Sequence, residues 1–352
     1  MREYKNPLCI REAHLNCPLP LSLEAYWNCE ADCLHCMGRR LNQVWGTEQR
    51  AADPERVCRT LTLAASKPAR VGAAPLTAAL AQRKALWIGR KADPYQPLEL
   101  ERHVTRHYIQ TLTALNWPFI ICTRYTDNAM VDEGLLTAGG MVTMLVEITP
   151  GGEADWDVFE RRRTTPVENR LRAARQWMRL GIRVGVRGEP YIPGYHTPKQ
   201  FRDMLRRLRA FGLRSYNTYN LHLNPYTLQR LCDAGLDIER IWAHNQDTHW
   251  RPIQQRLCRI AQEEGIELGC PDFVNVPTDW RARVNTCCGV PVAGAFTFNT
   301  HHWRQMLQCG VSGADVLART WEGIGTEKDR ARARLIVTGN SEDFYTMKDA
   351  GL

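Results

Sequence analysis

Three cysteines near the N-terminus have a spacing that suits metal binding. Residues 26–36 read YWNCEADCLHC, so Cys29, Cys33 and Cys36 form the pattern C-x3-C-x2-C directly after the first candidate strand. Three thiolates on one short loop can hold three irons of a 4Fe–4S cube and leave the fourth iron open. An open iron can chelate the amino and carboxylate groups of S-adenosylmethionine (SAM). One electron from the cluster then cleaves a carbon–sulfur bond to give methionine and a 5′-deoxyadenosyl radical, while the protein supplies position and excludes water.

Structural zinc and coincidence are the alternatives to an iron–sulfur cluster at these cysteines. Structural zinc usually has four ligands, commonly in paired C-x2-C units, and no fourth cysteine is near. His35 could complete a Cys3His site, but it lies inside the tight C-x2-C turn, an awkward place from which to reach the same metal. Coincidence is conceivable because the chain has 13 cysteines. We prefer the iron–sulfur interpretation to both.

Composition excludes several classes of protein. Of the 352 residues, 44% are hydrophobic, which is enough to bury a full core and excludes a wholly disordered chain. The mean hydropathy is −0.41, and we find no run of eighteen apolar residues to span a bilayer and no apolar N-terminal stretch typical of a signal peptide. The cysteine count is odd and the chain is long, which disfavours a disulfide framework. We expect a soluble, cytoplasmic monomer without membrane association.

The elements that must position the cysteines alternate along the chain. Candidate strands are residues 21–28, 85–89, 119–123, 142–149, 183–187 and 216–223. Candidate helices are residues 54–65, 99–115, 131–138, 166–180, 198–211 and 225–233. Six successive strand–helix units predict a parallel sheet with right-handed crossovers. Because a complete barrel needs eight such units, we expect an α/β fold of the partial (β/α)6 TIM-barrel type.

The domain limits follow from where this alternation stops. We expect an N-terminal segment at 1–20, the partial barrel at 21–235, and a cysteine-containing C-terminal extension at 236–352 that covers the barrel mouth. One more strand is expected near 265–268, after a helix near 252–264. Two helix starts carry a cap followed by proline, Asp53-Pro54 and Thr165-Pro166.

The cluster motif and its place after the first strand resemble the radical SAM superfamily. That resemblance implies a partial (β/α)6 barrel with the cluster loop after the first strand. The residue before the last cysteine is usually aromatic in that superfamily and packs near the adenine of SAM, whereas this chain has His35 there. His35 is therefore a candidate cofactor-binding residue, with adenine packing altered.

Further segments are similar to the spore photoproduct lyase-like branch, also called DNA repair photolyases. They are IGRKADPYQPLE at 88–99, Thr123-Arg124 at the end of the third strand, Glu147 at the end of the fourth, Glu160…Pro166…Arg170, and GVRGEPYIPG at 185–194. The resemblance covers about residues 20–225. It implies that the polar pair at the end of the third strand reaches the bound SAM.

Physical reasoning places the same polar residues at one site. The carboxyl ends of parallel barrel strands meet at the mouth where ligands bind. Candidate cofactor-binding residues at these ends are Gly89, Asp93, Thr123, Arg124, Glu147 and Arg187. Gly89 permits close approach of the backbone, and Arg124 could bind the methionine carboxylate in a bidentate manner. Surface ion pairs or caps are the alternative roles.

The hydrogen donor is a separate question. Tyr95 lies in a proline-rich turn at the expected mouth and is a candidate catalytic residue that stacks a base or donates hydrogen, with plain packing as the alternative. Spore photoproduct lyase uses a cysteine donor downstream of its cluster loop. This chain has no cysteine between Cys58 and Cys122. That absence favours a rearrangement over simple lesion repair, because in a rearrangement the product radical can take hydrogen back from 5′-deoxyadenosine.

Four cysteines in the extension could bind a second metal. They are Cys270, Cys287, Cys288 and Cys309. Some radical SAM branches carry an auxiliary iron–sulfur cluster in such an extension, but these spacings match no recognised ligand pattern. We therefore favour buried or redox-active thiols.

The net charge of +8 suits a polyanionic partner. Arginines cluster at 161–163 and along 202–214, and for the second cluster a solvated helix face is the simpler interpretation. Together with 11 tryptophans available for stacking, the charge favours nucleic acid.

We therefore expect a radical SAM enzyme that abstracts hydrogen from a thymine-derived base in DNA. The outcome is either rearrangement (isomerase-type base hypermodification) or bond cleavage (lyase-type repair), with flavodoxin or ferredoxin as electron donor. The alternatives are a radical SAM enzyme that modifies a peptide or small molecule with an auxiliary cluster, and a zinc-bound, non-enzymatic nucleic-acid module.

Overall fold

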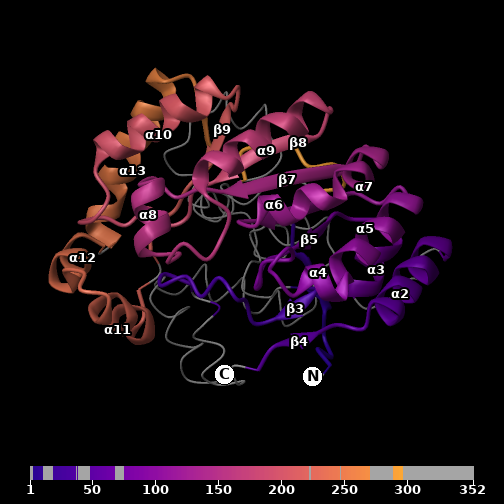
Figure 1. The fold of residues 1–352 in the computed structure, drawn as a ribbon. Coiled ribbons are helices and arrows are strands. Elements are labelled where there is room, and N and C mark those ends of the chain that lie inside the picture. The colour runs from indigo at the N-terminus through magenta and orange to yellow at the C-terminus, as the bar shows by residue number, and fades with distance from the viewer. Residues whose placement is uncertain are drawn as a thin grey trace, which may run out of the picture.

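A curved, mostly parallel sheet forms the centre of the molecule (Figure 1). The computed structural model describes residues 3–10, 19–36, 38, 48–67, 75–221, 223–245, 247–269 and 288–295. The strand order is β1-β2-β5-β6-β7-β8-β9-β10. The strands are β1 (Leu8–Ile10), β2 (Leu21–Leu23), β5 (Leu86–Ile88), β6 (Phe119–Thr123), β7 (Val142–Glu147), β8 (Arg183–Arg187), β9 (Ser215–Asn217) and β10 (Glu267–Gly269). All neighbours from β2 to β10 are parallel.

The sheet is a partial barrel, as expected. Its order begins with β1 and ends with β10, so the sheet does not close among the described strands. β1 is antiparallel to β2 and was not predicted. β10 pairs with β9 and provides the further strand expected near 265–268. No described helix is both long and apolar enough to cross a membrane.

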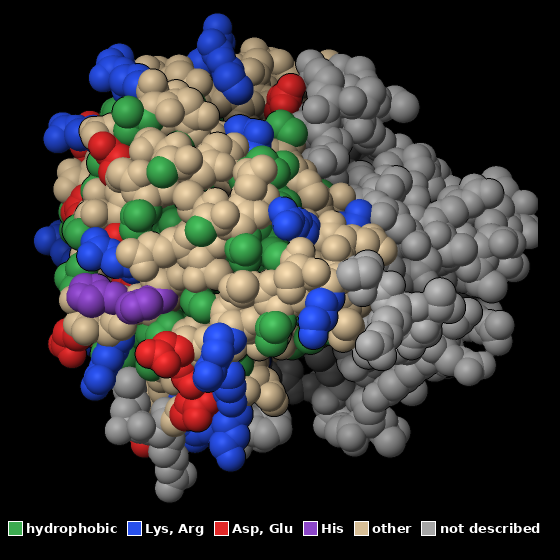
Figure 2. Space-filling view, turned by 90° about the vertical axis from the view of Figure 1, so that its right-hand side faces the viewer, with side chains coloured by type: hydrophobic (Ala, Val, Ile, Leu, Met, Phe, Trp, Pro, Cys, Tyr) green, Lys and Arg blue, Asp and Glu red, His purple; other side chains and the backbone are tan. Residues whose placement is uncertain are grey.

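Helices lie around the outside of the sheet (Figure 1). They are α2 (Pro54–Ser66), α3 (Pro75–Ala81), α4 (Glu99–Arg102), α5 (Val104–Ala114), α6 (Thr126–Ala129), η2 (Met130–Asp132, a 3₁₀ turn), α7 (Glu133–Ala138), α8 (Glu153–Val158), α9 (Val167–Arg179), α10 (Pro198–Ala210), α11 (Pro225–Asp233), α12 (Ile238–His244) and α13 (Asp247–Glu263). Figure 2 shows the side of α2 and α7, where charges of both signs are scattered among apolar side chains.

Alternation along the strands divides the apolar residues between two cores. Phe119 and Ile121 of β6 pack in the large core beneath the outer helices, whereas Ile120 and Cys122 point into the barrel. This follows from the two-residue repeat of a strand, whose successive side chains leave opposite faces. Both faces of the sheet are therefore buried, which is typical of a parallel sheet.

Residues 288–295 fill the inside of the barrel at the amino ends of the strands. Val290 and Val292 pack with the inward side chains of the strands, and the Ala85 amide donates to the Gly294 carbonyl over 2.9 Å at the entry to β5. This part of the C-terminal extension thus lies at the end of the barrel opposite the mouth. The apolar side chains of these residues complete the barrel core, and the expectation that the extension as a whole covers the mouth stays a prediction.

Three local predictions were wrong. The first strand ends at Leu23, and the next residues form a separate short strand, β3 (Tyr26–Trp27), antiparallel to β4 (Arg50–Ala51). The helix expected over 99–115 is two helices, because His103 adopts a left-handed backbone with φ of 54°. Thr165 does not cap α9: its hydroxyl accepts from the Asp127 amide and its carbonyl from Arg170.

Candidate active site at the carboxyl ends of the strands

The loop with the three cysteines directly follows β2 and β3, at the carboxyl edge of the sheet. Its backbone turns sharply twice, at Asn28 with φ of 74° and Asp32 with φ of 48°. Asn and Asp tolerate this left-handed conformation better than most residues. The turn closes with a hydrogen bond from the Cys36 amide to the Cys33 carbonyl, 3.1 Å long. We call residues 28–36 the cysteine loop.

The segment after β5 holds one side of the cysteine loop. The Gln96 amide group donates to the Asn28 carbonyl over 3.1 Å and accepts from the Glu30 amide over 2.9 Å. The Glu30 carboxylate in turn accepts from the Leu98 amide over 3.1 Å. Because Gln96 is fully buried, these paired bonds tie the loop firmly to its neighbour.

Arg230 of α11 holds the other side of the loop, 197 residues away in sequence. Its guanidinium donates to the Cys33 carbonyl over 2.9 Å, and to the carbonyl and carboxylate of Asp32 over 3.0 and 2.8 Å. The planar donor fork of arginine suits several acceptors at once. Sequence reasoning missed Arg230, since nothing local distinguishes it from other arginines on helices.

The three thiols lie close enough to influence one another. Burial, with a smaller contribution from the charge of Asp93, raises the pKa of Cys29 to about 12. Burial also raises the pKa of Cys33 well above its usual value, with contributions from Cys36 and Cys29. The thiols of Cys29 and Cys33 are therefore protonated at neutral pH without metal, and binding of a metal would release these protons.

No three His, Cys, Asp or Glu side chains in the described residues are grouped as they would be around one metal ion. A cube differs from a single ion, because each of its irons binds its own thiolate. Separate thiols on one tightly held loop suit the cube.

Asp93 organises the backbone beside the cysteine loop. Its carboxylate accepts from the Thr123 hydroxyl over 2.7 Å, from the Arg124 amide over 2.6 Å and from the Tyr95 amide over 3.0 Å. Burial raises the pKa of Asp93 to about 6, although these donors oppose the shift. The turn before Asp93 needs glycine: at Gly89, with φ of 85°, a Cβ atom would lie 2.6 Å from the Cys122 carbonyl.

Arg124 is the centre of a buried charge network. Its guanidinium contacts Glu147 at 2.9 Å, Glu160 at 2.9 Å and the His35 ring at 3.3 Å. Glu147 also pairs with Arg187 of the next strand. The residues predicted for cofactor binding are therefore connected. Asp93 bonds to Thr123 and to the Arg124 amide, and Arg124 contacts His35 and Glu147. Glu147 in turn pairs with Arg187, and Gly89 begins the turn that leads to Asp93.

Glu160 connects this network to a second buried arginine, Arg170. Its side chain is 1% exposed and pairs with both Arg124 and the fully buried Arg170. Burial alone would raise the pKa of Glu160, but the charges of Arg170 and Arg124 lower it to about 2. The sequence pointed to Glu160 and Arg170 only through the resemblance in layout.

His35 has one ring nitrogen without a partner among the described residues. Arginine can only donate, so Nε2 of His35 accepts from Arg124, and the neutral ring must carry its proton on Nδ1. Burial, and next the charge of Arg124, lower the pKa of His35 to about 3, which keeps the ring neutral. Nδ1 is buried and bonds to no residue that the structure describes. Since buried donors are nearly always paired, this donor suits an acceptor on a bound cofactor.

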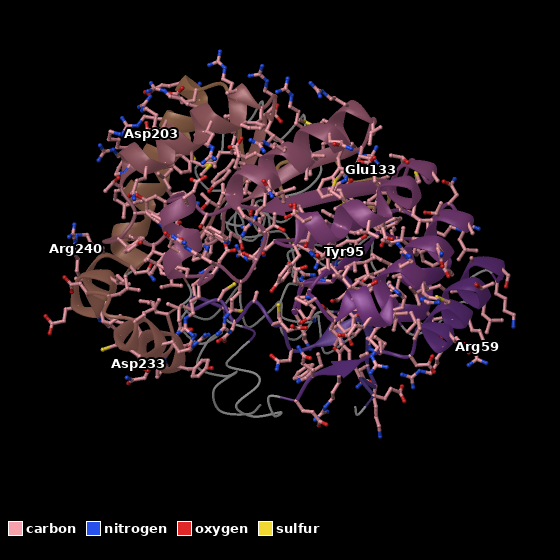
Figure 3. All side chains as sticks on the ribbon, in the orientation of Figure 1. Arg59, Tyr95, Glu133, Asp203, Asp233 and Arg240 are labelled. Atoms are coloured by element: carbon pink, nitrogen blue, oxygen red, sulfur yellow. The ribbon has the colours of Figure 1, made fainter. Side chains whose placement is uncertain are left out.

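The remaining predictions concern Tyr95 and the four cysteines of the C-terminal extension. Tyr95 is 1% exposed, and its hydroxyl donates to Asp132 over 3.3 Å; Figure 3 labels it among the elements around the barrel. This geometry agrees with the packing alternative, and a catalytic role for Tyr95 stays a prediction. Cys288 is buried in the barrel core, whereas Cys270, Cys287 and Cys309 lie outside the described residues.

No family model matches the chain, and no curated protein matches it by sequence. Solved structures do match. Spore photoproduct lyase complexed with dinucleoside spore photoproduct aligns over 76% of this chain and 80% of its own, at 12% identity and a TM-score of 0.58. The chain has the fold of spore photoproduct lyase. A variant of that lyase with bound AdoMet and the same dinucleoside covers 72% of this chain and 76% of its own, at 12% identity and a TM-score of 0.54.

Streptococcus suis SuiB bound to S-adenosylmethionine aligns more weakly. It covers 74% of this chain and 53% of SuiB, at 12% identity and a TM-score of 0.47. The similarity to spore photoproduct lyase concerns the fold, and it agrees with the partial barrel expected from the alternation of strands and helices.

Proposed function

We propose that this protein is a radical SAM enzyme that acts on a thymine-derived base in DNA. The observation that carries the proposal is the cysteine loop, held on both sides at the carboxyl edge of the sheet and adjacent to a buried polar network. The fold of spore photoproduct lyase supports it. Cys29, Cys33 and Cys36 would bind the cluster, which when bound supplies the electron for cleavage of SAM to methionine and a 5′-deoxyadenosyl radical.

The surrounding residues position these groups. Arg124 has its nitrogens committed to Glu147, Glu160 and His35, so it holds His35 in place beside the cysteine loop. These contacts engage three of the five N–H donors of Arg124. His35 would donate from Nδ1 to the bound cofactor, and the apolar packing of Phe159 against its ring helps exclude water.

DNA is the favoured substrate for two reasons. The chain carries a net charge of +8, and the structurally similar lyase was solved with a dinucleoside. A thymine-derived base would lose a hydrogen to the radical, and the outcome would be rearrangement or bond cleavage. The absence of cysteine between Cys58 and Cys122 favours rearrangement. We propose flavodoxin or ferredoxin as the electron donor.

Anaerobic reconstitution tests the proposal. We expect about four irons per chain, visible absorbance from the cluster, and formation of 5′-deoxyadenosine from SAM and a reductant. Cys29→Ala, Cys33→Ala and Cys36→Ala should each lose the absorbance and the 5′-deoxyadenosine, whereas Cys232→Ala, which changes an exposed thiol on α11, should keep both. Mass spectrometry of nucleoside digests of candidate DNA should then detect a base of changed mass or retention.

Other outcomes of the same experiments would favour one of the alternative functions. About eight irons per chain, the content of two such cubes, would favour an auxiliary cluster and a peptide or small-molecule substrate. A colourless protein that contains zinc would contradict both enzymatic hypotheses. Formation of 5′-deoxyadenosine without any changed nucleoside would contradict the DNA substrate while leaving the radical chemistry in place.

A further inference from the structure

Three arginines contact Asp32 of the cysteine loop, and a fourth lies between two of them in sequence. Arg161 and Arg163 approach the Asp32 carboxylate at 3.6 and 3.4 Å, and Arg230 contacts the same carboxylate at 2.8 Å. Arg162 lies between the first two in sequence and pairs with Asp157. We call these four arginines the arginine rim. Because Asp32 lies between two of the cluster cysteines in sequence, the rim borders the candidate active site.

The rim has more positive than negative charge. Its four guanidinium groups share two carboxylates, those of Asp32 and Asp157. The side chains of Arg161, Arg162 and Arg163 are 45%, 68% and 50% exposed. Exposed ion pairs contribute little stability, so Arg161 and Arg163 can exchange Asp32 for another anion at small cost.

The backbone of the rim is preorganised. Arg161 and Arg162 adopt a left-handed conformation, with φ of 51° and 55°, which residues other than glycine rarely do. Hydrogen bonds from the Arg162 amide to the Trp156 carbonyl, 3.1 Å, and from the Arg163 amide to the Glu160 carbonyl, 3.0 Å, keep this shape. The buried Glu160 side chain anchors the segment in the charge network below. An unfavourable backbone held in this way is common at functional sites.

The other arginine cluster has a different environment. On α10, Arg202 and Arg206 pair with Glu264, and Arg207 pairs with Glu153 and Glu168. These arginines join helices to one another and are balanced by carboxylates. The rim, not α10, therefore offers cations to a partner.

We propose that the arginine rim binds the phosphate backbone of the nucleic-acid strand whose base enters the active site. This rests on the proposed function. Planar guanidinium groups suit bidentate contact with phosphate oxygens, and contacts to the backbone position a strand without reading its sequence. The rim would thus set where along the strand the reacting base enters.

Binding of a labelled, thymine-containing oligodeoxynucleotide by the reconstituted protein, over a series of KCl concentrations, tests this inference. The double variant Arg161→Gln/Arg163→Gln should lower the slope of log affinity against log salt by about 0.7 per lost contact for a single strand. Arg161→Lys/Arg163→Lys should largely restore the slope, because it keeps both charges. The matched control Arg172→Gln/Lys199→Gln removes two exposed charges that pair within α9 and α10 and should leave the slope unchanged.

The outcomes separate this inference from the proposed function. Iron content and 5′-deoxyadenosine formation without DNA should be the same in all four proteins, and if the unmodified protein forms no 5′-deoxyadenosine, the proposed function itself fails. Equal loss of affinity in the Gln double variant and its control would show a general effect of charge and would contradict phosphate binding by the arginine rim. An unchanged slope in the Gln double variant, or tight binding of poly-glutamate in place of the oligonucleotide, would overturn it as well.

Discussion

At the scale of single residues, the candidate site depends on buried charges that balance one another. Arg124 is 7% exposed and has a carboxylate on either side, Glu147 and Glu160, with His35 as its third contact. Removing one partner of a buried ion pair leaves the other charge unsatisfied in a medium that solvates it poorly. The position of His35 therefore depends on Glu160, which acts on it through Arg124.

The substitution Glu160→Gln tests this dependence. We expect a loss of about 3–5 kcal/mol in the free energy of unfolding, because two buried guanidinium groups lose their shared carboxylate. The matched control Glu153→Gln, which breaks an exposed pair with Arg207, should cost at most about 1 kcal/mol. Urea unfolding at neutral pH measures both. Equal losses in the two variants would contradict a central role for Glu160.

The pH dependence of stability follows from the same group. The pKa of Glu160 in the folded protein is lowered to about 2, below its unfolded value of about 4.3. Its ion pairs therefore stabilise fully above the unfolded value, and this stabilisation is lost as the pH falls toward 2. Urea unfolding over this acidic range should accordingly show a smaller loss of stability in Glu160→Gln than in the unmodified protein.

At the scale of elements, the cysteine loop is positioned by two segments that lie far apart in the sequence. Gln96, after β5, fastens its first half and Arg230, on α11, its second half. A short loop with two left-handed residues would lose much conformational entropy if it had to organise around a cluster alone. The hydrogen bonds from Gln96 and Arg230 order the loop when the protein folds, so less conformational entropy is lost when a cluster binds.

We expect Arg230→Gln to loosen the second half of the loop. The free energy of unfolding should fall by about 1.5–3 kcal/mol, since hydrogen bonds from a charged donor are lost. Iron content after anaerobic reconstitution should fall too. Arg230→Lys should restore it only partly, because an ammonium lacks the planar fork.

The control for this substitution is Arg207→Gln, which removes one arginine from α10 and leaves the loop untouched. It should keep its full iron content. If Arg230→Gln retained as much iron as Arg207→Gln and unfolded at the same urea concentration, α11 would have no role in holding the loop.

At the scale of the whole molecule, the two ends of the barrel are built differently. Polar and charged residues occupy the carboxyl end, whereas 288–295 packs apolar side chains into the amino end. Gly185 of β8 makes room for this segment: a Cβ atom there would lie 2.7 Å from the Val290 side chain and 3.1 Å from Leu145. The absence of a side chain at Gly185 thus allows Val290 to reach the barrel wall.

A double-mutant cycle checks this packing. Gly185→Ala should cost about 1–3 kcal/mol through overpacking, and Val290→Ala alone should also destabilise by leaving a cavity. The double variant should be more stable than the sum of the two losses predicts, because each change relieves the other. Gly134→Ala on α7, where nothing described lies within 4 Å of the added atom, is the control. Strict additivity in urea unfolding would contradict contact between 288–295 and β8.

Much of the site was predictable because its signals are local. The spacing of Cys29, Cys33 and Cys36 is a short pattern that a single loop imposes. The alternation of strands and helices predicted the parallel sheet, and parallel strands bring their carboxyl ends together, which placed Asp93 and Arg124 at one edge. These inferences need only the periodicity of the chain and the direction of its strands.

What the tertiary structure alone decided concerns residues far apart in sequence. The sequence by itself determined the cysteine spacing, the partial barrel and the polar strand ends. Only the fold decided that Arg230 grips the cysteine loop, that Arg161 and Arg163 share Asp32, and that 288–295 fills the barrel. The physical reason is that an arginine or valine has the same local pattern wherever it lies, and its partner is chosen by packing across the whole molecule.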